Sequence, residues 1–215
     1  MKEIWLKLIS DFDTFERSDI IDIEKYYTNV IGYNYCSLNR YYHDLTHIKN
    51  LLDFSKEFEL NEKESSLLEL AVWFHDVIYE PRSCDNEVNS GMMFMKFERD
   101  YLHLNSSDTI HVMRLIHVTK HDIPTRNRLE NIMCDIDLRL LAANEEVYQQ
   151  ISKDVRKEFK HLSEDEWCNG RFVFINSMLD KELIFHTNEY CELYEDKARH
   201  NLNEEKQTLI SKIIT

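Results

Sequence analysis

The chain has 215 residues, with 3 glycines, 2 prolines and a formal net charge of -14 at pH 7. This length can bury a sizeable core in one domain. So few glycines and prolines exclude an all-β fold with many tight turns, and also a glycine-rich phosphate loop. The negative charge excludes broad binding to nucleic-acid backbones, which depends on clustered lysines and arginines.

The predicted elements are all helices, because apolar and charged residues alternate at about 3.6-residue spacing. In chain order, helices are predicted over residues 2–16, 19–31, 40–58, 62–79, 85–103, 107–119, 126–141, 144–160, 164–181 and 189–213. Asn61 is a predicted N-cap, Pro81 stops the helix before it, and Pro124 breaks the chain. No linker-like or repeated segment interrupts the series, so a single all-α domain over residues 1–215 is predicted.

Neither membrane insertion nor secretion is expected. No stretch approaches the ~20 apolar residues of a membrane span. The amino terminus lacks the hydrophobic core of a signal peptide. Five cysteines are scattered, odd in number and without a C-x-x-C pair, which is typical of reduced cytosolic thiols. A cytoplasmic protein is therefore predicted.

Two polar residues, His75 and Asp76, interrupt the apolar run of residues 70–79. A buried imidazole beside a buried carboxylate needs a partner, and a divalent cation satisfies both. Adjacent residues on a helix diverge by roughly 100°, so both can reach one ion only near a helix end or distortion. Because Pro81 stops the helix, the doublet is expected in its last turns.

Two further runs supply ligands of the same kind. His43 and His47 are four residues apart, and on a helix they would project from one face. Asp137 lies far downstream, in the run of residues 134–138. Burying two imidazoles and two carboxylates without an ion would be costly. The order His, His-Asp, Asp therefore indicates a metal site.

This order resembles that of the HD-domain superfamily of metal-dependent phosphohydrolases. The resemblance implies a single HD-domain-like helical bundle with additional N- and C-terminal helices. Its metal-site core would lie at about residues 38–142, and its C-terminal helices at 144–213. The resemblance also implies that a divalent metal ion is held by His47, His75, Asp76 and Asp137.

The run Tyr42-His43-Asp44-Leu45-Thr46-His47 is also similar to the Tyr-His-Asn-x-x-His signature of the cyclic-nucleotide phosphodiesterases, members of the same superfamily. On that likeness His43 is the general acid and His47 a ligand, while Asp44 stands where the signature has Asn. Nearly the whole chain resembles a bacterial branch of predicted HD phosphohydrolases. The strings that carry this likeness are residues 40–43, 73–79, 86–90, 119–121, 135–138 and 198–202.

Four residues are candidates for orienting water or binding phosphate beside the ion. Glu87 could be a base or a water-orienting group, or simply a first-turn acid that complements the helix dipole. Lys120 and His121 follow an apolar run, as phosphate-contacting groups would, although Lys120 could also be a solvated charge. Arg40 is a further candidate for neutralising phosphate.

Other basic residues have two readings each. His117 and His121 could hold a second ion, or could be one phosphate-contacting and one packing histidine. Arg156, Arg171 and Arg199 match positions in the same bacterial branch. Each lies on a charged helix face, where a solvated or salt-bridged role is at least as well supported.

The expected reaction is metal-assisted hydrolysis of a phosphoester or phosphoanhydride in a small phosphorylated substrate of nucleotide type. Asp137, or Glu87 through water, would orient the nucleophile, and His43 would donate a proton to the leaving oxygen. Mixed His and carboxylate ligation suits Mn²⁺, Fe²⁺, Co²⁺, Ni²⁺ or Zn²⁺ better than Mg²⁺, and all six stay candidates.

Three alternatives stay open. The first is a di-iron HD-type oxygenase, in which His117 and His121 would hold a second ion. The second is a non-catalytic metal or nucleotide sensor. The third is a plain helical interaction module. The oligomeric state is also open, and a homo-oligomer is compatible with the sequence.

Overall fold

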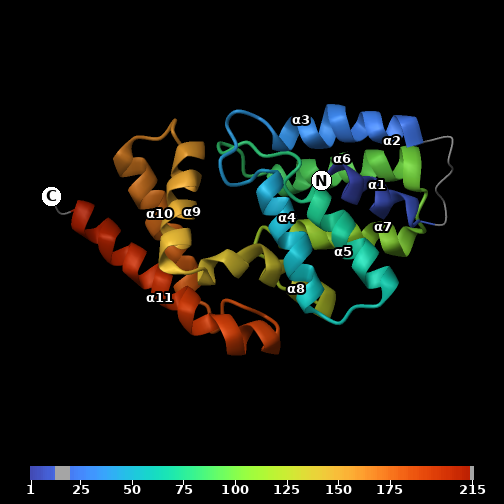
Figure 1. The fold of residues 1–215 in the computed structure, drawn as a ribbon. Helices are drawn as coiled ribbons and strands as arrows, with labels where there is room; N and C mark the ends of the chain where they lie inside the picture. The colour runs from blue at the N-terminus through green and yellow to red at the C-terminus, as the bar shows by residue number, and fades with distance from the viewer. Residues whose placement is uncertain (13–19, 214–215) are drawn as a thin grey trace. The chain divides into compact units, whose positions relative to one another are not determined.

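The computed structural model describes residues 1–12 and 20–213, and every element of regular structure in those ranges is a helix (Figure 1). The predicted all-α class is therefore confirmed. None of the helices in these ranges combines the length and the apolar character that crossing a membrane requires. Residues 13–16 of the first predicted helix and residue 19 of the second lie outside the described residues.

The chain divides into two compact units, Met1–Met133 and Cys134–Thr215. Helix α8 (Arg128–Leu138) begins in the first unit and ends in the second. The single domain over residues 1–215 stays a prediction.

The first unit contains most of the predicted helices. In chain order these are α1 (Lys2–Ser10), α2 (Ile20–Tyr26), the π-helical turn η2 (Tyr27–Ile31), α3 (Gly32–Tyr35), α4 (Leu45–Phe54), the 3-10 turn η3 (Ser55–Glu57), α5 (Glu62–Phe74), α6 (Asn86–Phe97), the π-helical turn η4 (Glu98–Leu102) and α7 (Ser106–Val118).

Helix α5 is the central element of this unit and contacts α1, α4, α6 and α7 (Figure 1). It begins with a capping box, in which the Asn61 side chain accepts from the Glu64 backbone N–H and Glu64 reaches back to the Asn61 backbone. The predicted N-cap is thus confirmed. Residues 70–74 are all buried, and five consecutive residues point to all sides of a helix, so this part of α5 is surrounded by other helices. Trp5 of α1, for example, packs edge-on against Trp73.

Two predicted helix boundaries near the doublet are wrong. The helix expected over 62–79 ends at Phe74, and His75 is its C-cap. The helix expected over 40–58 begins only at Leu45. Asp44 is its N-cap: the backbone of this residue is extended, and its side chain accepts hydrogen bonds from the backbone N–H groups of Thr46 and His47. The expectation that the doublet lies near a helix end is confirmed, although Pro81 is not the residue that ends the helix.

The second unit contains the end of α8, the 3-10 turn η5 (Arg139–Ala142), α9 (Glu145–Glu158), α10 (Glu164–Leu179) and α11 (Asn188–Ile213). A largely buried ion pair joins two of these helices. Both Nε and Nη2 of Arg171 donate to Glu205, each at 2.9 Å. Tyr148 and Ser152 of α9 donate to the same carboxylate. Such a network fixes the pairing of the three helices.

The three arginines that matched the bacterial branch all have partners within the protein. Arg171 pairs with Glu205, Arg156 with Glu164 and Arg199 with Glu195. Arg199 also donates to three backbone carbonyls, one at the end of α10 and two in the loop before α11. The salt-bridged reading of these residues is therefore confirmed.

Candidate metal centre

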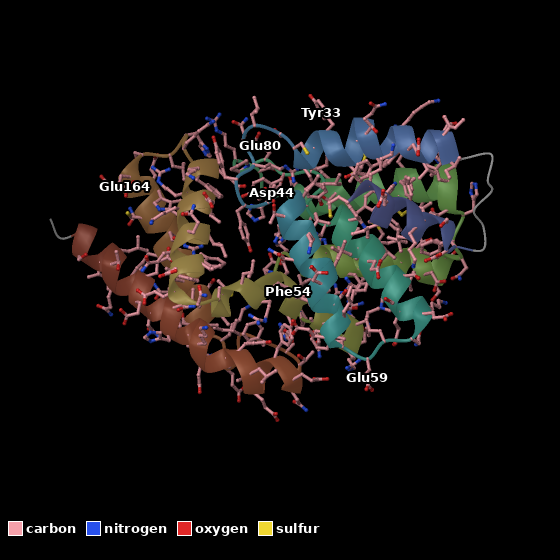
Figure 2. The ribbon with its side chains drawn as sticks, viewed as in Figure 1. Tyr33, Asp44, Phe54, Glu59, Glu80 and Glu164 are labelled. Carbon is pink, nitrogen blue, oxygen red and sulfur yellow. The ribbon has the colours of Figure 1, made fainter. Side chains whose placement is uncertain are left out.

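The first predicted ligand, His47, is positioned by the start of α4. Oδ1 of Asp44 accepts hydrogen bonds from the backbone N–H groups of Thr46 at 2.6 Å and of His47 at 3.2 Å. Figure 2 labels Asp44 and Phe54 at the two ends of this helix. His47 lies on the buried face together with Ile48. Its imidazole is therefore held inside the first unit.

Removing this cap should loosen the start of α4. We expect Asp44→Ala to lower the free energy of unfolding by about 1 kcal/mol, and Asp44→Asn to leave it nearly unchanged, because Asn caps as well as Asp. Urea unfolding of the two variants would measure this difference. Equal destabilisation in both would mean that the negative charge, rather than the cap, is what the fold requires.

The second predicted ligand, His75, is oriented by the end of α5. Its Nδ1 lies 2.8 Å from the backbone oxygen of Val72. A carbonyl oxygen can only accept, so Nδ1 must carry the hydrogen of this bond. In the neutral ring, Nε2 then has its lone pair available, which is the form in which histidine binds a metal ion. His75 thus presents Nε2 as a potential ligand atom.

Three ligand atoms converge in the first unit. Nε2 of His47 lies 3.2 Å from Nε2 of His75. Oδ2 of Asp76 lies 3.2 Å from Nε2 of His75 and 3.8 Å from Nε2 of His47. The centre of the circle through these three atoms is about 2.0 Å from each of them. Bonds from first-row divalent ions to imidazole nitrogen and carboxylate oxygen are about 2.0–2.2 Å long. The residues present therefore fit such an ion.

The surroundings suit ligands rather than solvated groups. The side chains of His47 and His75 are each 1% exposed, and that of Asp76 is 14% exposed. Burial would raise the pKa of the Asp76 carboxyl, but in the metal-free protein, where Nε2 of His75 can also carry a hydrogen, the charge and hydrogen bond of His75, with the charges of His43 and His47, hold that pKa below its ordinary value. Asp76 is therefore ionised at neutral pH.

His47 and His75 belong to a group of side chains in the described chain that could hold a metal ion. Asp137, the fourth predicted ligand, is half-buried near the C-terminal end of α8. It belongs to the second unit. Its predicted ligation stays a prediction.

His43 lies close to His47 but outside helix α4. It precedes the Asp44 cap, so the expectation that His43 and His47 share one helix face is wrong. Its half-buried ring stacks on Tyr79, with centroids 4.2 Å apart and planes inclined by 28°. The ring centroids of His43 and His47 are 5.7 Å apart. This stacking holds the His43 ring beside the ligand group.

Arg40 lies in the same region and contacts the main chain. Its guanidinium donates to the backbone oxygens of His43, Asp76 and Val77. Sequence reasoning proposed Arg40 for phosphate binding and contained no signal for these three contacts. It also missed Tyr79, which appears in the sequence only as the last residue of an apolar run. The contact of Arg40 with substrate stays a prediction.

The remaining predicted residues lie on or after other helices. Glu87 is in the first turn of α6, where an acid complements the helix dipole. Lys120 pairs with Asp122 at 3.2 Å, and that carboxylate raises the pKa of the lysine. His121 has a left-handed backbone, with φ of 58°. The roles predicted for Glu87, Lys120 and His121 stay predictions.

His117 and His121, the candidates for a second ion, do not lie on one helix. Helix α7 ends at Val118, with Thr119 as its C-cap, so only His117 is helical. Within the described residues, the group of potential metal ligands does not include either histidine.

A cavity of about 460 Å³ lies elsewhere in the first unit, at the starts of α5 and α7. None of the predicted ligands lines it. In comparisons with known proteins, no family model, no curated protein and no solved structure matches this chain.

Proposed function

We propose that this chain is a metal-dependent phosphohydrolase of the HD type. The observation that carries the proposal is the triangle of ligand atoms from His47, His75 and Asp76, whose centre is about one metal–ligand bond length from each atom. The motif order of the sequence supports it independently. The substrate class we propose is a small phosphorylated molecule of nucleotide type.

His47, His75 and Asp76 would hold the ion, and we propose Asp137 as the fourth ligand. Asp137 belongs to the second unit, and the motif order of the sequence is what supports its ligation. When bound, a divalent ion polarises a phosphoryl oxygen and lowers the pKa of bound water towards ~7. Mixed nitrogen and oxygen ligation favours Mn²⁺, Fe²⁺, Co²⁺, Ni²⁺ or Zn²⁺ over Mg²⁺.

The other predicted residues would act on the substrate. His43 would donate a proton to the leaving oxygen, because its imidazole stands beside the ligand group and histidine is the side chain that most often acts as a general acid. Glu87 or Asp137 would orient the attacking water. Lys120 and His121 would bind the phosphate.

Metal analysis of protein purified without chelator, followed by a phosphate-release screen over nucleotides with each candidate metal, tests this function. The proposal requires about one divalent ion per chain and release of phosphate from at least one substrate. Metal without hydrolysis across the screen would favour the sensor. Protein that takes up no metal and keeps its stability would favour an interaction module.

The number of ions separates the hydrolase from the oxygenase. We expect His121→Ala to raise KM by roughly 10-fold, the effect of losing one charge-assisted hydrogen bond to phosphate, with unchanged metal content. Steady-state kinetics and elemental analysis would measure both, with His117→Ala as the matched control. Two irons per chain, one of them lost in His121→Ala, would overturn the hydrolase assignment.

A further inference from the structure

The guanidinium of Arg40 joins the two segments that carry the predicted acid and the metal-binding doublet. Nη1 donates to the backbone oxygen of His43 at 3.0 Å and to that of Asp76 at 2.6 Å, and Nη2 donates to that of Val77 at 3.0 Å. Three of the five N–H donors of this side chain are thus engaged with the main chain. One planar group therefore sets the distance between residue 43 and residues 76 and 77.

Aromatic rings hold this guanidinium in place. Its central carbon lies 4.8 Å from the ring centroid of Tyr35 and 5.6 Å from that of Tyr79. These distances are within the range of cation–π attraction. Tyr79 also stacks on the ring of His43, and the hydroxyl of Tyr35 donates to the backbone oxygen of Trp73 at 3.1 Å. Side chains from residues 35, 40 and 79 thus brace both segments.

The charge of Arg40 also suits this location. Helix α5 ends at Phe74, and the carbonyl groups at and beyond a helix C-terminus carry partial negative charge. A guanidinium that donates to the backbone oxygens of Asp76 and Val77 stabilises the turn that presents the doublet. The backbone donors of this turn are partly bound as well, since Ile78 N–H donates to Ser90.

We propose that Arg40 is a positioning residue: it holds the His75-Asp76 turn and His43 in register and does not itself bind the substrate. The part of this inference that concerns catalysis rests on the proposed function, whereas the part that concerns metal affinity does not. Lysine cannot replace arginine here, because one ammonium nitrogen cannot present a planar fork to three separated carbonyls.

The test compares Arg40→Lys with the wild type and with a matched control, Arg82→Lys, which changes an exposed arginine in the following loop. Mn²⁺ and Zn²⁺ affinities are measured by titration of the metal-free protein against a competing chelator, and kinetics are measured well below each unfolding temperature. We expect the metal Kd of Arg40→Lys to rise by about 10–100-fold, as when a group that supports a ligand is lost. We also expect kcat to fall while KM changes little, and Arg82→Lys to match the wild type.

The opposite pattern would overturn the proposal. A raised KM with unchanged metal Kd would make Arg40 a phosphate-binding residue, and no change in either quantity would make it a structural or solvated charge. If the wild type binds metal but hydrolyses no substrate, the proposed function fails while the metal titration still decides the role of Arg40. If the wild type binds neither metal, both proposals fail. Arg40→Lys keeps the charge and the aliphatic stem, so it preserves folding better than truncation to alanine.

Discussion

Asp76→Asn should lose its metal while keeping its fold. Oδ2 of Asp76 is one corner of the ligand triangle, and asparagine keeps the shape of this side chain but removes the negative charge. Loss of a group that only supports a ligand weakens metal binding by ~10–100-fold, so loss of a ligand charge should weaken it by at least ~10²-fold. Elemental analysis after dialysis should therefore find only a small fraction of one ion per chain.

The control for this experiment is Asp85→Asn, which makes the same substitution at an exposed aspartate nine residues after Asp76. Circular dichroism of Asp76→Asn must remain helical, since a buried site that loses one partner leaves the others uncompensated. Equal metal content in the wild type and in a folded Asp76→Asn would remove Asp76 from the ligand set.

His43→Ala should separate catalysis from metal binding. If His43 is the general acid, we expect kcat to fall by ~10²–10⁴-fold, which is the range of general acid–base catalysis. Metal content should stay close to that of the wild type, because His43 is not a corner of the triangle. The decline of wild-type activity at high pH, where an acid loses its proton, should also change in the variant. Single-turnover rates and a pH profile would measure these effects.

Each other outcome for His43 has a definite meaning. Loss of metal in His43→Ala would make it a ligand, and unchanged kcat would leave it as a packing residue against Tyr79. His200→Ala, at an exposed position of α11, is the control for removal of a histidine.

The sequence was sufficient to predict features that depend on local interactions. The scarcity of glycine and proline predicted the all-α class, and the cap at Asn61 is visible because its partner Glu64 is only three residues away. The placement of the His75-Asp76 doublet near a helix end followed from the divergence of adjacent side chains on a helix.

Features that depend on distant residues could not be predicted in this way. Helix propensity alone extends the first histidine segment back to Arg40, but in the folded chain Arg40 bonds to backbone oxygens more than 35 residues away. Tertiary context overrides the periodic pattern there.

The central position of α5 couples the proposed ion to the folding of the first unit. His75 follows directly on a helix that packs against α1, α4, α6 and α7, so its imidazole cannot turn away without disturbing the core. An ion bound there stabilises the native state by mass action, and at 100 times its Kd it would add about 2.7 kcal/mol to the free energy of unfolding. The supply of metal would then determine how much folded protein persists as well as how fast it works.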